Sequence, residues 1–435
     1  MRVEIKNVGS ISNFDVDISG LTVISGENDS GKTALSKVIY ALGQSSSFYK
    51  FKRKILIRNR IKNIYDKMFI VLSNYMHSEF PEEKEEDLNG ALSALMEFLY
   101  TARKMTSSDD MDFAPRYVVE NAEYILNYFH IDNDEVRKEF SHMVIMLKRM
   151  SMDNVRFADH FLSSLKEEFA NDLVKKNSTS DFSEIIITVD GKKSYIKFDN
   201  KKIIETDGDF DIPFIDSTFV DGPAVFLLEK VLGRTDYVMR SKVRSSVPHH
   251  VIDLCSKIDG TRNTLSSISE NDNSCWNMND FYDGTISFEP EKEDFHLKKD
   301  GYIFSGNNVS SGVKALSVMD ILSRGGYLNK ESIIILDEPE TNLHPKWQKK
   351  YAKAIVALST KGVRIIVNTH SPYMLESLKA YGGIFNSGAK FYFSHKVKNN
   401  VKLLDTHGDI SIIIEALSSP LRDLMLEMQG DLDDF

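Results

Sequence analysis

The sequence has few cysteines, no long apolar run and no excess of basic residues. Its 435 residues include only two cysteines, Cys255 and Cys275, which stand far apart and form no CxxC pair. We therefore expect neither a disulfide framework nor a cysteine-based zinc site. No stretch approaches the roughly 18 uninterrupted apolar residues of a membrane span, and the first residues alternate rather than form a signal peptide. These absences predict a cytoplasmic protein with no membrane attachment.

Acidic residues outnumber basic ones, 64 Asp and Glu against 54 Lys and Arg, and the formal net charge is −10. This balance argues against a protein that coats nucleic acid or an anionic membrane through bulk charge. At roughly 150 residues per domain, the length allows about three domain-sized units or one domain with a large insertion.

Hydrophobic periodicity divides the chain into strand-rich ends and a helical middle. Period-two alternation and short apolar runs predict strands, whereas apolar residues spaced three and four apart predict helices. The runs over 333–336 and 363–367 are almost entirely apolar, which is typical of parallel strands that are buried on both faces. Strands are also predicted over 2–8, 14–18, 21–24, 184–189, 194–198, 212–215, 390–394 and 401–404.

Three segments follow from this pattern. Residues 1–45 form the first part of an α/β domain, 46–180 form a helical insertion, and 181–435 form the second part of the same domain. Asp190-Gly191 suits a tight hairpin turn within the second part. Pro420 is expected to divide the C-terminal helical region into two pieces.

Residues 26–33, GENDSGKT, match the pattern GxxxxGK[ST] between an apolar strand and a helix, which is the setting of a phosphate-binding loop. The glycines let successive backbone N–H groups and the helix N-terminus face phosphate oxygens. Lys32 would reach the same oxygens, and the hydroxyl of Thr33 would bind Mg²⁺. The candidate nucleotide-binding residues of this loop are Gly26, Asn28, Ser30, Gly31, Lys32 and Thr33.

A second motif lies late in the chain, where the apolar strand over 333–336 ends in Asp337 and Glu338. Asp337 would contribute to the Mg²⁺ shell, and Glu338 would act as the base for the attacking water. An apolar strand that ends in acids is common, so the weight of this motif comes from the residues that follow it.

The string LDEPETNLHP over 336–345 resembles the Walker B motif and D-loop of AAA ATPases with an ABC/SMC-type head. It is most similar to the anti-phage defence branch, which includes the overcoming-lysogenization-defect (OLD) nucleases and the ATPase subunit of Septu-type systems. Transporter subunits of this class have Thr after the proline and Asp at the end of the D-loop, where this chain has Glu340 and His344. This departure favours the soluble DNA-linked and defence branches.

Two further motifs resemble parts of such a head. Ser310, Ser311 and Gly312 precede an amphipathic helix and resemble the signature motif, although Val309 before them and Val313 after them depart from the family pattern. His370 follows the strand over 363–367 and resembles the switch histidine that senses the γ phosphate. The resemblance covers roughly residues 1–45 and 285–400.

The resemblance implies a fold, a set of cofactors and a quaternary state. The fold is an α/β P-loop NTPase head, a mixed sheet with flanking helices, interrupted by the helical insertion. The cofactors are ATP and Mg²⁺, and the catalytic residues are Glu338, His370 and Lys32. Because the chain has one phosphate-binding loop and one signature motif, a homodimer with ATP sandwiched between two heads is expected, and a higher oligomer stays open.

The insertion carries no motif with an assigned chemistry. From Lys50 to Lys67 there are eight basic residues against one acid, Asp66, which leaves nucleic-acid contact open, although a solvated helix face is commoner. We interpret His249-His250 as a surface pair rather than a metal-ligand set.

The 65 residues after His370 are too few for the separate nuclease domain of OLD-type proteins. We therefore expect no intrinsic nuclease, and predict an ATP-hydrolysing sensor or regulator of a defence system whose nuclease or toxin is a second protein. The alternative is an SMC/RecF-like DNA repair or recombination ATPase that acts directly on DNA. A transporter subunit fits less well because the helical middle is long.

Overall fold

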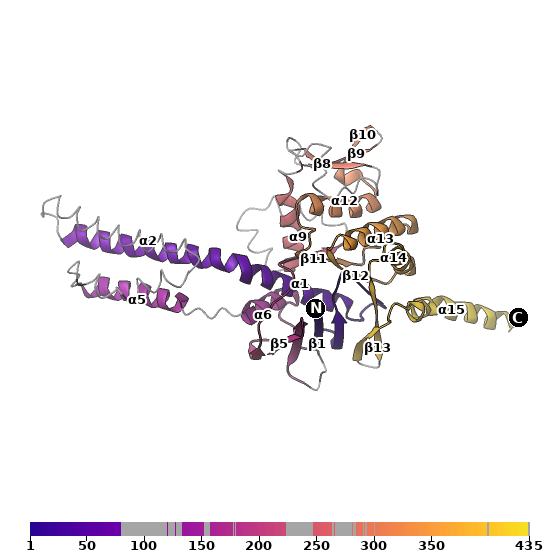
Figure 1. Ribbon diagram of the computed structural model, residues 1–435, viewed down its shortest axis with the longest axis horizontal. Coiled ribbons are helices and arrows are strands. Elements are labelled where there is room, and N and C mark those ends of the chain that lie inside the picture. The colour runs from indigo at the N-terminus through magenta and orange to yellow at the C-terminus, as the bar shows by residue number, and fades with distance from the viewer. Residues whose placement is uncertain are drawn as a thin grey trace. The chain divides into compact units, whose positions relative to one another are not determined.

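The chain forms two compact units, and each is described by itself. The computed structural model describes residues 1–79, 120, 127, 133–151, 157–176, 178, 180–222, 247–262, 265, 281, 284–289, 291, 294–299, 301–397 and 400–433. The larger unit contains residues 1–46 and 157–435, and the smaller unit contains residues 47–156 (Figure 1). The predicted insertion ends at residue 180, but the helix after residue 156 belongs to the larger unit, where Phe161 and Leu165 are fully buried in its core.

The larger unit contains a mixed sheet of eleven described strands: β1 (Arg2–Val8), β2 (Ile11–Asp17), β3 (Leu21–Gly26), β4 (Ser183–Val189), β5 (Lys192–Phe198), β6 (Ile203–Asp207), β7 (Asp216–Asp221), β11 (Ser332–Asp337), β12 (Arg364–Thr369), β13 (Lys390–Val397) and β14 (Asn400–Asp405). Their order is β6-β5-β4-β1-β2-β14-β13-β3-β12-β11-β7. The five strands from β13 to β7 are parallel, and those from β6 to β2 pair antiparallel. The predicted α/β class is confirmed.

Local sequence explains these strands. Val3 and Ile5 alternate with more exposed residues in β1, whereas every residue of β11 is buried. Asp190 and Gly191 both have positive φ in the turn between β4 and β5, as the hairpin prediction requires. The strand expected over 212–215 is wrong, because β7 begins only at residue 216, where it pairs with β11.

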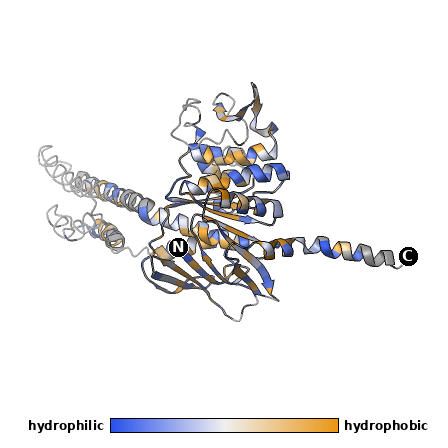
Figure 2. Ribbon diagram, turned by 45° about the vertical axis from the view of Figure 1, so that its right-hand side comes forward, coloured by the Kyte–Doolittle hydropathy of each residue, from blue (hydrophilic) through white to orange (hydrophobic). Residues whose placement is uncertain are grey.

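Two hydrophobic clusters fill the two faces of the sheet. Ile333 and Ile335 of β11 belong to one cluster, and Ile334 and Leu336 belong to the other. The first cluster is covered by α1 (Lys32–Ser47) and α6 (Phe157–Glu168), and the second by α9 (His249–Gly260), α12 (Ser311–Arg324), α13 (Pro345–Thr360) and α14 (Pro372–Ile384). The hydrophobic colouring of Figure 2 concentrates where these helices and strands meet.

A small antiparallel sheet and a long helix complete the larger unit. The small sheet contains β8 (Thr285–Glu289), β9 (Asp294–Lys299) and β10 (Tyr302–Ser305), and the turn η3 (Gly306–Asn308) leads from it to α12. The helix α15 (Ser411–Asp433) is continuous through Pro420, so the predicted division is wrong. Proline removes the usual donor to the carbonyl of Ala416, and the hydroxyl of Ser419 donates to that carbonyl instead (3.0 Å).

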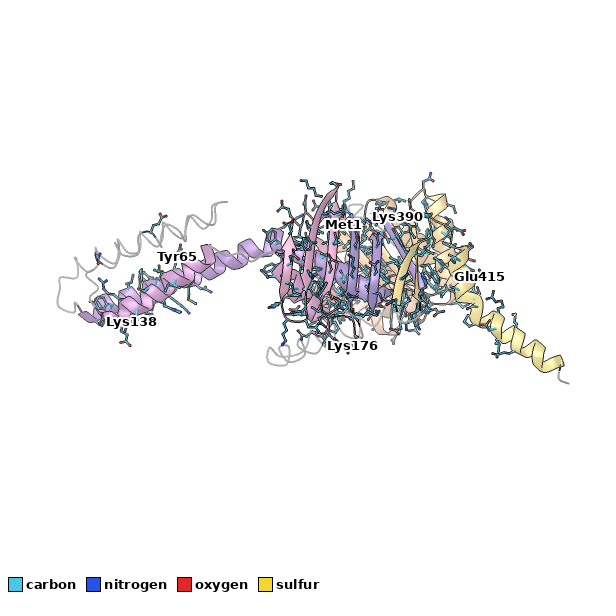
Figure 3. The ribbon with its side chains drawn as sticks, turned by 90° about the horizontal axis from the view of Figure 1, so that it is seen from below. Met1, Tyr65, Lys138, Lys176, Lys390 and Glu415 are labelled. Carbon is cyan, nitrogen blue, oxygen red and sulfur yellow. The ribbon has the colours of Figure 1, made fainter. Side chains whose placement is uncertain are left out.

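The smaller unit is helical in its described part. It contains the π-helix η1 (Phe48–Lys52), α2 (Arg53–Glu79) and α5 (Asp134–Ser151). α2 and α5 pack together, and Figure 3 labels Tyr65 on the first and Lys138 on the second. The buried residues of α2 recur three and four apart, as in a helix pair with one apolar seam. They are Tyr65, Met68, Leu72 and Tyr75, and the buried residues of α5 are Phe140 and Met143.

The basic run lies partly outside the described side chains. Lys50, Lys62 and Lys67 are exposed, and the other basic side chains from Lys52 to Arg60 lie outside the description. Among the described helices, none is long and apolar enough to cross a membrane.

Candidate active site

The parallel register brings the ends of four strands to one edge of the sheet. Residue 25 of β3 pairs with Thr369 of β12, Asn368 of β12 pairs with Asp337 of β11, and Asp337 pairs with Asp221 of β7. The phosphate-binding loop leaves β3 at this same edge. The topology therefore unites the two motifs that the sequence separates by about 300 residues.

The loop between β3 and α1 has the backbone that its glycines permit. Gly26 has φ +157° and Gly31 has φ +83°. A Cβ at Gly26 would collide with the backbone carbonyl oxygen of Ser394 on β13, so only glycine fits.

Lys32 is folded back onto the loop. Its Nζ donates to the carbonyl oxygens of Gly26 (2.9 Å) and Glu27 (2.6 Å) and lies 3.3 Å from Ser30 Oγ. Burial lowers the pKa of Lys32, while the nearby carboxylates, of which Glu338 acts most strongly, oppose that shift. A phosphate would replace backbone carbonyls as the partner of this ammonium group.

Thr33 and Asp337 form the link between the two motifs. Thr33 Oγ1 donates to Asp337 Oδ2 (2.7 Å), and Asn368 Nδ2 donates both to Asp337 Oδ1 (2.6 Å) and to Ser36 Oγ (2.8 Å). Burial raises the pKa of Asp337, the bonds from Asn368 and Thr33 lower it, and the charge of Asp221 raises it. Hydroxyl and carboxylate oxygens are the ligands that Mg²⁺ prefers, so Thr33 and Asp337 fit the predicted metal role.

Asn368 was not among the predicted site residues. It is fully buried, and its Oδ1 has no hydrogen-bond partner among the described residues. The available signal was its place at the end of an apolar strand. That signal becomes specific only when the pairing of β12 with β11 is known.

Glu338 and His370 lie together beside Asp337. Glu338 has φ +46°, an uncommon conformation for a non-glycine residue, and its N–H donates to the carbonyl of Asn368 (3.0 Å). His370 Nδ1 is 3.3 Å from Glu338 Oε1 and 3.5 Å from Glu340 Oε1. The Glu338 and His370 side chains are each 41% exposed, whereas that of Glu340 is buried. Glu338 and His370, two of the three predicted catalytic residues, are thus accessible, and the buried Glu340 lies beside His370.

The signature residues lie away from the phosphate-binding loop of the same chain. Ser310 is exposed at the N-terminus of α12, and Gly312 packs so closely on the Trp347 ring that a Cβ would clash. Within the described residues, no hydrogen bond or ion pair joins Ser310, Ser311 or Gly312 to the loop over 26–33. The reason is topological, because α1 and α12 cover opposite faces of the sheet.

A cavity of about 330 Å³ lies on the other side of the loop from Asp337, beside β13 and the turn between β1 and β2. Asp29 from the loop and Lys396 from β13 line it and form an ion pair (2.6 Å). Lys176 and Asp172, also in its wall, form a second ion pair (2.6 Å). This cavity was not predicted from the sequence, because its walls come from segments that are distant along the chain.

The interpretation of His249-His250 as a surface pair is wrong. His250 is buried, and its Nδ1 lies 2.6 Å from Glu168 Oε2 at the end of α6. His249 Nδ1 lies 2.9 Å from the hydroxyl of Tyr40 on α1. Both histidines therefore join α9 to the neighbouring helices.

Comparisons with known proteins agree with this geometry. The family described as "AAA ATPase domain" matches residues 1–220, half of the chain. The chain belongs to the AAA ATPase domain family. The family described as "AAA domain, putative AbiEii toxin, Type IV TA system" matches residues 265–376, which include the signature, Asp337, Glu338 and His370. Membership implies ATP binding and hydrolysis.

The similar curated proteins are distant. The "Retron Ec83 probable ATPase" of Escherichia coli is 27% identical over 159 residues, which are 31% of this chain and 29% of that protein. The "Old nuclease" of Escherichia phage P2 is 29% identical over 107 residues, 24% of this chain and 18% of that protein. The matched region thus spans less than a third of either relative.

Solved structures of SMC heads align with most of this chain, at low sequence identity. An SMC head bound to the C-terminal winged-helix domain of ScpA covers 93% of this chain and 96% of its own, with 12% identity and a TM-score of 0.41. The SMC head domain from Thermotoga maritima covers 93% and 98%, with 10% identity and a TM-score of 0.40.

Proposed function

We propose that the chain hydrolyses ATP to ADP and phosphate at the edge formed by β3, β12 and β11. The observation that carries this proposal is the direct bond between Thr33 and Asp337, which joins the two motifs. Lys32 would hold phosphate oxygens, and Thr33 with Asp337 would hold Mg²⁺, which would neutralise phosphate charge when bound. Glu338 would accept the proton of the attacking water, and His370 would contact the γ phosphate.

The cavity beside β13 supports this placement. The Mg²⁺ side of the loop is fixed by Asp337, so a nucleotide that lies across the loop would extend its nucleoside toward the opposite side. The cavity of about 330 Å³ lies there, and its carboxylates and ammonium groups could pair with polar edges of a base or ribose. The ion pair between Asp29 and Lys396 would then have to open or shift.

The test of hydrolysis compares Glu338→Gln with a matched surface variant, Glu331→Gln, since Glu331 is exposed just before β11. Loss of a general base predicts a fall in kcat of about 10²–10⁴-fold with ATP still bound. The surface variant should match the wild type. Equal turnover in all three proteins would rule out the role given to Glu338.

We also propose a homodimer in which the signature residues of each subunit complete the site of its partner. The support is that Ser310 and Ser311 begin α12 away from the loop of their own chain, while an exposed helix N-terminus suits a phosphate. Light scattering of Glu338→Gln should show a dimer with saturating ATP and Mg²⁺. A protein that stays monomeric under those conditions would refute this arrangement, and a larger mass would indicate a higher oligomer.

We further propose that this ATPase regulates a separate effector, a nuclease or toxin, in anti-phage defence. The names of the relatives support this, since one is a retron ATPase and one matched family carries a toxin–antitoxin description. Co-purification of the chain with the products of its neighbouring genes should recover a stoichiometric effector. Restriction of phage by this chain alone would contradict the proposal, and a partner-free ATPase stimulated by duplex DNA would favour repair or recombination.

A further inference from the structure

Glu340 is a buried acid that the sequence motifs leave without a role. One oxygen, Oε1, accepts three hydrogen bonds from the end of β12 and from the residues that lead into α14. The donors are Thr369 Oγ1 (2.7 Å), the backbone N–H of His370 (2.8 Å) and the backbone N–H of Ser371 (3.2 Å). An anion at a helix N-terminus is stabilised by such donors, so Glu340 anchors the backbone that carries His370.

Glu340 and His370 each have one buried polar side-chain atom without a hydrogen-bond partner among the described residues. These atoms are Glu340 Oε2 and His370 Nδ1. Nδ1 is 3.5 Å from Glu340 Oε1 and 3.3 Å from Glu338 Oε1, which is ion-pair distance without hydrogen-bond geometry. Buried polar atoms without partners are costly, and a hydrogen bond from Nδ1 to the Glu340 carboxylate would satisfy the unpaired Nδ1.

We propose that Glu340 is the positioning residue of His370. Through its three accepted bonds it fixes the backbone of His370, and through its charge it holds a proton on Nδ1. The imidazole then keeps one orientation, with Nε2 as the nitrogen left for the substrate. Glu340 thereby ties the loop after β11 to the loop after β12. This inference rests on the proposed ATPase function and adds a residue to its site.

The chain offers well-matched variants. Glu340→Gln keeps a carbonyl oxygen that can accept the same three bonds, but it removes the charge and presents an amide to Nδ1. Glu340→Asp keeps the charge and shortens the side chain. Glu376→Gln is the control, because Glu376 is exposed on α14. The full chain is used for every measurement.

The first readout needs no nucleotide. Long-range ¹H–¹⁵N NMR of the histidine rings reports which nitrogen carries the proton, and His370→Asn assigns the signal among the 11 histidines. We expect His370 of the wild type and of Glu376→Gln to carry the proton on Nδ1. In Glu340→Gln the population should move toward Nε2–H, and Glu340→Asp should lie between them.

The second readout is steady-state ATPase activity with the thermal midpoint measured alongside. Glu340→Gln should lower kcat by about 10–100-fold while KM for ATP changes less than about threefold, the pattern of a lost positioning contact. Glu340→Asp should recover part of kcat. Should Glu340→Gln fail to fold, Glu340→Asp against Glu376→Gln still gives both readouts.

Each outcome decides the question. A Glu340→Gln protein with an unchanged His370 spectrum overturns the inference, as does one whose thermal midpoint falls while kcat and the spectrum stay as in the wild type. A wild type that hydrolyses no ATP, combined with the expected change in the His370 spectrum, would refute the proposed function and leave the positioning role intact. A wild type that hydrolyses ATP, with no effect of Glu340→Gln on kcat, would refute the positioning role and leave the proposed function intact.

Discussion

The substitution Asn368→Asp tests the link between the phosphate-binding loop and Asp337. In the wild type, Asn368 Nδ2 is 2.6 Å from Asp337 Oδ1, and Asn368 is fully buried. The substitution replaces this donor by a second carboxylate. Two charges about 4 Å apart at an effective dielectric constant of about 20 repel by about 4 kcal/mol. One of the two carboxyl groups can instead take up a proton, which at pH 7 costs about 4 kcal/mol because the pH lies about three units above an ordinary Asp pKa.

The sign of the pH dependence follows from that proton. The folded variant holds a proton that the unfolded chain releases, so its folded-state pKa is raised and its stability falls as the pH rises. The deficit relative to the wild type should therefore be about 4 kcal/mol at pH 7 and about 1–2 kcal/mol at pH 5. Acid should therefore rescue this variant.

Urea unfolding without nucleotide, followed by circular dichroism at both pH values, measures these differences. Asn329→Asp serves as the control, because Asn329 is an exposed turn residue that would lose only its bond to the carbonyl of Gly326, at a cost of no more than about 1 kcal/mol. A deficit in Asn368→Asp that is absent, or that does not shrink between pH 7 and pH 5, would refute the reasoning. It would mean that Asn368 does not lie against an ionised Asp337 in solution.

Three further predictions concern other parts of the larger unit. Gly26→Ala forces a Cβ against the carbonyl oxygen of Ser394. It should lower the free energy of unfolding in urea by about 1–3 kcal/mol and abolish binding of a fluorescent ATP analogue. Tight binding of the analogue would contradict the loop geometry. Burial raises the pKa of Cys255 to about 11. In a Cys275→Ser protein at pH 8, Ellman's reagent should therefore react with Cys255 only after urea is added. Rapid labelling of the folded protein would contradict this by showing the thiol to be accessible. Burial raises the pKa of Tyr392 to about 12, so the stability it contributes is complete below pH 10 and is lost as the pH rises toward 12. Unfolding at pH 9 and 11.5 should show a loss of up to about 2 kcal/mol that Tyr392→Phe does not share, and equal losses would exclude this tyrosine as the cause.

Sequence patterns were sufficient for the features that depend on local chemistry. The GxxxxGK[ST] pattern required a strand before residue 26 and a helix after residue 31, and both are present. Buried parallel strands were predictable from their apolar composition, since alternation is lost when both faces are covered. The division at Pro420 failed because the proline rule does not anticipate that Ser419 supplies the missing donor.

Features that depend on register were not predictable from one sequence. The pairing of β12 with both β3 and β11 places Asn368 against Asp337 and, two residues later, His370 beside Glu338. A shift of one residue in either pairing would turn these side chains to the opposite face of the sheet. The sequence shows that each strand ends in polar residues, but only the register decides which of them meet.

Glu340 illustrates how the register gives a role to a residue that a motif treats as a spacer. In the sequence, Glu340 stands where transporter subunits have Thr, and this difference served only to choose between branches of the family. In the structure its Oε1 accepts hydrogen bonds from the backbone N–H groups of His370 and Ser371, so a movement of the loop after β11 would strain the start of α14. A change at Glu338 or at the bound phosphate would therefore reach α14 through Glu340. Because α14 packs on α13, which holds Gly312 through Trp347, the same chain of contacts leads from the hydrolytic site to the signature residues that a partner subunit would receive.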